Sequence, residues 1–129
     1  MTSKPAFLFD LDGTLADTLP DLAASTNYVR EQNGLAAVDV ATVRTYIGDG
    51  ARTLLRRALA ELGPTDAHPN SAGPNAGGPV DARIDRAFAT YIEHHRAQCT
   101  VHSQLFPGVQ QHLEQLRIAG HPIAVVTNK

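Results

Sequence analysis

The sequence predicts an α/β fold, and three features carry that prediction. Two short apolar runs, residues 6–9 and 123–126, each stop at polar residues, which is typical of strands buried on both faces of a parallel sheet. Helical periodicity dominates the segment between them. Ligands of open α/β sheets bind beyond the carboxyl ends of the strands, so both runs deliver polar residues to one place. We therefore expect parallel strands that form part of a core, with a helical insertion between them.

Five helical segments are expected between the two runs. Pro20 and Gly34 bracket the first, and Asp39 is expected to cap the second. The clearest helix follows Gly50, where apolar residues recur at i, i+3, i+4, i+7, i+8 and i+11. On the fourth helix, His95 falls on the apolar face and is expected to pack in the core. The expected helices span residues 22–33, 40–47, 51–62, 81–98 and 109–119.

Residues 63–80 interrupt this helical pattern. Four glycines and four prolines stand among these eighteen residues, and Val80 is the one large apolar residue. Such a segment cannot bury a core of its own. We expect a flexible Gly/Pro-rich surface loop between two helices, with a structured binding loop as the alternative.

Composition and charge exclude several classes of protein. The 129 residues include 11 basic and 13 acidic ones, a net charge of −2. This near balance lacks the basic excess of a nucleic-acid-binding face, and no run approaches the ~18 apolar residues of a membrane span. Asp10 and Asp12 interrupt any signal-peptide pattern, so we expect a cytoplasmic protein. The single cysteine, Cys99, excludes an internal disulfide and is expected to be a structural thiol.

Two carboxylates two residues apart, Asp10 and Asp12, follow the first apolar run. A divalent cation relieves their mutual repulsion, and Mg2+ prefers oxygen ligands while it keeps waters that a phosphate can displace. One carboxylate can attack phosphorus, and the other can protonate a leaving alcohol and then activate water. Gly13 allows the backbone to turn and to approach a phosphate. A local Asx turn is the alternative for a bare D-x-D, but the complete string through Asp17 favours phosphoryl chemistry.

The string FDLDGTLADTLP, residues 9–20, resembles motif I of the haloacid dehalogenase (HAD) superfamily. Thr127, which follows the second apolar run, resembles motif II of that superfamily. Further pieces resemble its phosphoglycolate phosphatases, at residues 46–58 (YIGDGARTLLRRA), 106–109 (FPGV) and 125–129 (VVTNK).

The resemblance implies a domain organisation. Residues 1–17 and 105–129 would form the N-terminal part of a Rossmann-like core. Residues 18–104 would form an inserted α-helical cap that closes over the site, excludes water and selects the substrate.

The resemblance also implies roles for individual residues. Asp10 would be the catalytic nucleophile and a Mg2+ ligand. Asp12 would be the general acid/base and would bind Mg2+ through its backbone carbonyl. Thr127 and Asn128 would contact the phosphate.

Two further groups of residues take supporting roles by the same resemblance. Gly13, Thr14 and Asp17 would shape the turn beside the site. The substrate-facing loop of the cap would consist of Gly48, Asp49, Gly50 and Arg52. The alternative for this loop is an ordinary helix start, in which Asp49 caps the helix and Arg52 is solvated.

The activity implied is Mg2+-dependent hydrolysis of a phosphomonoester through an aspartyl-phosphate, on 2-phosphoglycolate or a similar small phosphorylated acid. A non-catalytic truncated remnant and a phosphatase for pyrophosphate or sugar phosphates are the alternatives. The stretch of sequence that ends at Lys129 shows no match to the superfamily's motif III lysine or to its motif IV carboxylates. We therefore expect these 129 residues by themselves to lack useful activity, and the sequence gives no oligomeric state.

Overall fold

The computed structural model describes residues 4–63 and 79–127, with the side chains of 79–81 left out. The chain divides into two compact units. One unit joins residues 1–20 to residues 100–129, and the other comprises residues 21–99. None of the described helices is long and apolar enough to cross a membrane.

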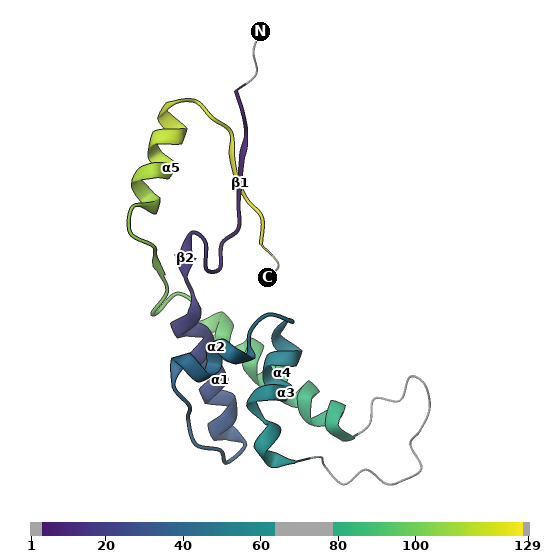
Figure 1. The fold of residues 1–129 in the computed structure, drawn as a ribbon. Helices are drawn as coiled ribbons and strands as arrows, with labels where there is room; N and C mark the ends of the chain where they lie inside the picture. The colour runs from purple at the N-terminus through teal and green to yellow at the C-terminus, as the bar shows by residue number, and fades with distance from the viewer. Residues whose placement is uncertain (1–3, 64–78, 128–129) are drawn as a thin grey trace, which may run out of the picture. The chain divides into compact units, whose positions relative to one another are not determined.

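A parallel strand pair forms the centre of the first unit. Strand β1 (Phe7–Phe9) pairs with β4 (Ile123–Val125) in parallel, with Phe7 opposite Ile123 and Phe9 opposite Val125. Figure 1 shows the two strands side by side, from opposite ends of the chain. Helix α5 (Val109–Ile118) leads into β4, as a crossover between parallel strands requires. This parallel pairing confirms the α/β prediction.

A second, smaller sheet in this unit was not predicted. Strand β2 (Ala16–Asp17) pairs in antiparallel fashion with β3 (Gln104–Leu105), and the Phe106 amide donates to the Leu15 carbonyl at 3.0 Å. Strands of two residues are too short for an alternating pattern to reveal them. They hold together the two segments through which the chain leaves this unit and returns to it.

The prediction that both strands are buried on both faces is wrong for the described residues. The rings of Phe7 and Phe9 stack on one face, 6.2 Å apart, whereas Leu8 on the other face is 70% exposed. Val125 and Val126 are exposed as well. Parallel sheets are normally covered on both sides, and within the described part of this unit helix α5 covers one side.

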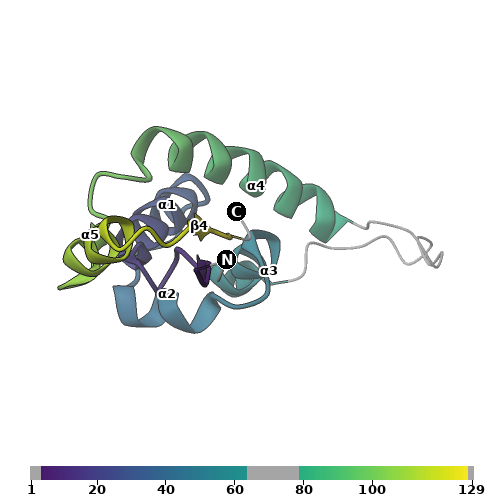
Figure 2. The ribbon, with the colours of Figure 1, turned by 90° about the horizontal axis from the view of Figure 1, so that it is seen from above.

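The second unit is helical. Its elements are α1 (Leu19–Gln32), α2 (Val40–Tyr46), α3 (Ala51–Ala58), the 3-10 turn η1 (Ala60–Leu62) and α4 (Pro79–Gln98). Figure 2 shows α4 as the long helix of this unit. Helices α1, α3 and α4 share one buried core, made by Val29, Leu54, Leu55, Leu59, Ile84, Ala87 and Tyr91. The apolar stripe predicted after Gly50 supplies three of these side chains.

Most of the expected helix ends are close to the observed ones. Asp39 caps α2, where its carboxylate accepts the Thr42 amide at 2.6 Å, and this hydrogen bond holds the pKa of Asp39 below its usual range. The helix expected over 51–62 ends at Ala58 and continues as a 3-10 turn. Of the predicted loop 63–80, residues 64–78 lie outside the described residues, and Pro79 begins α4.

His95 is half-buried beside Tyr91, so the expectation that it packs in the core is met only in part. Its ring stacks on Tyr91 with 5.4 Å between centroids, and its Nδ1 lies 3.1 Å from the Ser25 hydroxyl. The hydroxyl also lies 3.2 Å from Nδ1 of His94, which stacks on Tyr28. These contacts join α1 to α4 through polar side chains.

Arg30 of α1 is a buried charge that sequence patterns did not reveal. Its side chain is 2% exposed. Its Nε donates to the Ala36 carbonyl at 2.8 Å, one Nη donates to the Ala58 carbonyl at the end of α3, and the other pairs with Glu61 at 2.8 Å. One guanidinium thus ties together the α1–α2 connection, the end of α3 and the following 3-10 turn.

Replacing Arg30 with Met should destabilise the helical unit by roughly 2–4 kcal/mol, because the buried Ala58 carbonyl loses its donor. Glu61→Gln is the matched control. It should cost less than about 1 kcal/mol, since Glu61 is exposed. Equilibrium urea unfolding followed by circular dichroism measures both. Equal costs for the two variants would show that the ion pair, and not the backbone contacts, makes Arg30 important.

Candidate active site

The parallel register brings two predicted site residues to the same edge of the sheet. Asp10 directly follows β1, and Thr127 is the second residue after β4. The Val126 amide donates to the Phe9 carbonyl at 2.8 Å, which continues the pairing up to these residues. Both Asp10 and Thr127 are exposed, and Asn128 lies outside the described residues. The carboxyl ends of the two strands therefore present a carboxylate and a hydroxyl together.

A tight turn follows Asp10, and the Leu11 carbonyl organises it. This oxygen accepts three backbone amides, from Thr14 at 3.2 Å and from Leu15 and Ala16 at 3.0 Å each. Gly13 has a φ of 75°, a conformation that favours glycine, and its amide donates to the Ala16 carbonyl at 2.9 Å. The turn brings the chain back to form β2 directly after the two carboxylates.

Asp12 is held by a neighbour that sequence reasoning missed. The Thr18 hydroxyl donates to Oδ1 of Asp12 at 2.6 Å, and Thr18 is 7% exposed. A hydroxyl that donates to a carboxylate forms a short, charge-assisted hydrogen bond. Nothing in the spacing of Asp12 and Thr18 indicates this contact, because it depends on the path of the turn between them. Thr18 therefore joins the candidate site as a residue that positions Asp12.

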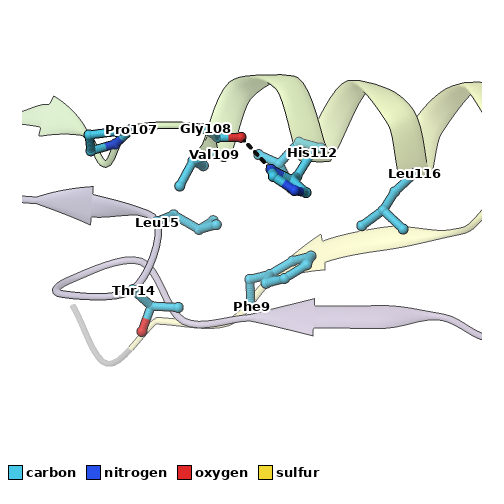
Figure 3. Close-up of a pocket in the computed structure, with 9 residues that line it drawn as sticks. Phe9, Thr14, Leu15, Pro107, Gly108, Val109, His112 and Leu116 are labelled. Atoms are coloured by element: carbon cyan, nitrogen blue, oxygen red, sulfur yellow. Dashed lines mark hydrogen bonds between the residues drawn. The ribbon is translucent and has the colours of Figure 1, made fainter.

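Asp17 and Thr14 take different places around the turn. Oδ1 of Asp17 accepts the Leu19 amide at 3.2 Å, where α1 begins. Oδ1 of Asp10 accepts the amide of its neighbour Leu11 at 2.8 Å. Thr14 is exposed and lines an apolar cavity (Figure 3).

This cavity, of about 300 Å3, lies between the turn, β1 and helix α5. Figure 3 shows Phe9 and Leu15 facing Val109 and Leu116 of the helix. His112, also on α5, has its Nδ1 2.8 Å from the Gly108 carbonyl. The complete lining is Phe9, Thr14, Leu15, Pro107, Gly108, Val109, His112, Leu113 and Leu116. Its apolar side chains suit packing and supply no groups for phosphoryl chemistry.

A second cavity, of about 320 Å3, lies beside β2 and β3. It is lined by Asp17, Pro20, His102, Gln104, Leu105, Phe106 and Pro107. The described linings of both cavities leave out Asp10, Asp12 and Thr127. Asp10 and Thr127 therefore lie exposed at the edge of the sheet, outside the described linings of these two cavities.

The donor set at this edge fits Mg2+. Within residues 4–63 and 79–127, no group of three or more His, Cys, Asp or Glu side chains could hold a metal ion. Mg2+ does not need such a group, since it is usually bound through one or two carboxylates and keeps several waters. The carboxylate of Asp10 and the carbonyl of Asp12 are oxygen donors of this kind. Zinc, which takes three or four His, Cys or carboxylate ligands, fits these residues poorly.

The predicted cap loop lies in the helical unit. Gly48 and Gly50 have φ values of 135° and 84°, and Gly50 precedes α3 without a side-chain cap. Asp49 pairs with Arg57 at 2.5 Å, so the alternative in which Asp49 caps the helix is wrong. Arg52 is not merely solvated either, because its guanidinium pairs with Asp85 of α4.

Comparison with known proteins identifies the family of this chain. The model for the haloacid dehalogenase-like hydrolases matches residues 7–129. A phosphoglycolate phosphatase of Agrobacterium fabrum is 37% identical over 132 residues, which cover 100% of this chain and 51% of the relative. One from Chromobacterium violaceum is 33% identical, covering 96% of this chain and 50% of the relative. The chain thus spans about half the length of the curated relatives it matches.

Solved structures give the same result. The crystal structure of a predicted phosphoglycolate phosphatase from Haemophilus somnus superimposes with a TM-score of 0.76 at 30% identity. The match covers 100% of this chain and 53% of that one. A haloacid dehalogenase-like hydrolase from Streptococcus pneumoniae gives a TM-score of 0.71 at 25% identity, covering 100% and 51%. With a family match that extends from β1 to the last residue, the chain belongs to the haloacid dehalogenase-like hydrolases.

Proposed function

We propose that the protein to which this chain belongs is a Mg2+-dependent phosphatase of small phosphorylated acids, with 2-phosphoglycolate as the substrate expected. The observation that carries the proposal is the register of β1 and β4, which puts Asp10 and Thr127 beyond the same strand ends. Family membership and relatives named phosphoglycolate phosphatases support it. The proposed place of this reaction is the cytoplasm.

In the first step, a carboxylate oxygen of Asp10 attacks phosphorus and forms an aspartyl-phosphate. The bond between phosphorus and the leaving oxygen breaks, and Asp12 donates a proton to that oxygen as the alcohol departs. Thr127, beyond the end of β4, would donate its hydroxyl to the transferring phosphoryl group. Asn128 would add an amide donor.

In the second step, Asp12 changes from general acid to general base, and the Asp10 carboxylate becomes the leaving group. Asp12, now deprotonated, takes a proton from water, whose oxygen attacks phosphorus. The bond to Asp10 breaks, inorganic phosphate leaves and the free carboxylate returns. The Thr18 hydroxyl keeps Asp12 in one orientation through both steps, since its hydrogen bond goes to Oδ1 alone. Mg2+, held by Asp10 and the Asp12 carbonyl, would neutralise negative charge on the phosphoryl oxygens.

The helical unit is proposed to act as the cap of this enzyme. Closure of a cap excludes water from the reacting groups and completes the site only when substrate is bound. The loop of Gly48, Asp49 and Gly50, with Arg52, would then meet the end of the substrate that is not transferred. A guanidinium is suited to this role because its planar donors match a carboxylate.

Asp10→Asn should abolish turnover, because an amide is not a nucleophile toward phosphorus. The measurement uses the complete gene product with Mg2+ and compares 2-phosphoglycolate with p-nitrophenyl phosphate. Trapping by beryllium fluoride, which mimics the phosphoryl group on a carboxylate, should be lost as well. Retention of a few per cent of turnover, with deamidation excluded by mass spectrometry, would contradict the nucleophile assignment.

Asp12→Ala should lower kcat by about 10²–10⁴-fold, the usual contribution of general acid/base catalysis. The loss should be smaller for aryl phosphates, whose leaving groups need little protonation. Rates for a series of aryl and alkyl phosphates test this difference. An equal loss across the series would assign Asp12 a structural role in place of proton transfer.

Thr18→Val should lower kcat by roughly 10-fold, because it removes a hydrogen bond to a charged group while it keeps the shape of the side chain. Thr18→Ser keeps the hydroxyl and should restore most of the rate. Steady-state kinetics of both variants, with thermal melts to check folding, measure the effect. A Ser variant as slow as the Val variant would mean that packing of Thr18, and not its hydroxyl, matters.

A further inference from the structure

Arg52 occupies an electrostatically unfavourable position at the start of α3. The N-terminus of a helix carries a partial positive charge, which favours acidic side chains and disfavours basic ones. The first turn of α3 contains no acidic residue, and Gly50 supplies no side-chain cap. Arg52 therefore adds a positive charge to an end that is already positive. Such a place attracts an anion, and in this structure the anion comes from another helix.

Helix α4 holds the Arg52 guanidinium with two side chains. Asp85 accepts a hydrogen bond from Nη1, and the guanidinium carbon lies 4.7 Å from the centre of the Phe88 ring. Residues three apart share one face of a helix, so the carboxylate and the ring act on the same group. The ring is partly buried against the core, which fixes the surface on which the guanidinium rests.

The ion pair itself is weakly held. The side chains of Arg52 and Asp85 are 49% and 58% exposed, and pairs as exposed as this contribute little because water competes for both charges. Arg57, about one and a half turns further along α3, makes a backbone contact as well as an ion pair. It pairs with Asp49 and also donates to the Tyr46 carbonyl at 2.9 Å, so it holds the loop in shape. Of these two arginines, Arg52 is the one whose anion can be exchanged without loss of a backbone contact that the structure shows.

We propose that Asp85 is an internal competitor for Arg52 and so lowers the affinity of the enzyme for substrates with a second anionic group. The proposal rests on the proposed function, in which Arg52 faces the substrate together with the loop of Gly48, Asp49 and Gly50. Without substrate, the Asp85 carboxylate neutralises Arg52. The carboxylate of a small phosphorylated acid replaces it, while Phe88 keeps the guanidinium in place.

The exchange moderates selectivity, because a substrate carboxylate gains at Arg52 only the difference between two similar pairings. A substrate with a carboxylate regains at Arg52 what it displaces. A phosphate ester with an uncharged leaving group cannot displace Asp85 and gains nothing from Arg52. Asp85 therefore acts on the binding of one class of substrate and not on the chemical step, which makes it a specificity-determining residue.

The test is Asp85→Asn in the complete gene product, which keeps the size of the side chain and an acceptor oxygen but removes the charge. KM for 2-phosphoglycolate should fall about two- to five-fold, the scale of a half-exposed ion pair. Its kcat should be unchanged, and so should KM for p-nitrophenyl phosphate, which has no carboxylate. Glu93→Gln is the matched control, since Glu93 is an exposed acid on the same helix. It should leave both KM values unchanged.

The same substitution in an Arg52→Gln background separates a direct effect from a general change in charge. Once Arg52 is absent, Asp85→Asn should no longer change KM for 2-phosphoglycolate. An effect that persists there, or an equal effect on both substrates, would overturn the inference alone. If the unsubstituted protein turns over neither substrate in an Asp10-dependent manner, the proposed function fails and the inference fails with it.

Discussion

The hydrogen bond from the Val126 amide to the Phe9 carbonyl, 2.8 Å long, extends the pairing of β1 with β4 to the place where both strands end. Two segments more than 110 residues apart in the chain thereby deliver Asp10 and Thr127 to the same edge. Because parallel strands run in one direction, their carboxyl ends coincide, and polar residues placed after each strand meet there. The common position of the proposed nucleophile and the proposed phosphate-binding residue follows from this pairing.

The turn after β1 converts that edge into a site with two distinct carboxylates. Asp10 remains exposed, while Asp12 is half-buried and held by Thr18. The difference arises from the Leu11 carbonyl, which gathers three amides and folds the chain back on itself. Two carboxylates with different surroundings can take different roles, one as nucleophile and the other in proton transfer. The antiparallel pairing of β2 with β3 then fixes the end of the turn.

The helical unit shows a second use of charge, in which cations organise the ends of helices. Arg30 donates to the Ala58 carbonyl at the end of α3, where a positive charge is favourable. Arg52 stands at the opposite end of the same helix, where a positive charge is unfavourable. The Asp85 carboxylate neutralises this charge. One arginine therefore stabilises the fold, and the other is available for exchange. The distinction follows from burial, since Arg30 is enclosed and Arg52 is half-exposed.

The sequence by itself determined the α/β class, the positions of the two parallel strands, the apolar stripe after Gly50 and the carboxylates of motif I, because each is a local pattern of residue types. It could not reveal Thr18 beside Asp12, the guanidinium of Arg30 within the helical unit or the pairing of Arg52 with Asp85. These contacts join residues that no regular spacing in the sequence links. The strands β2 and β3 were missed because two residues are too few to show an alternating pattern. Strand burial was overestimated because an apolar run records what a strand can bury, whereas the packing of neighbouring elements decides what it does bury. Local sequence patterns thus indicate which chemical groups are present, and only the path of the chain decides which of them come into contact.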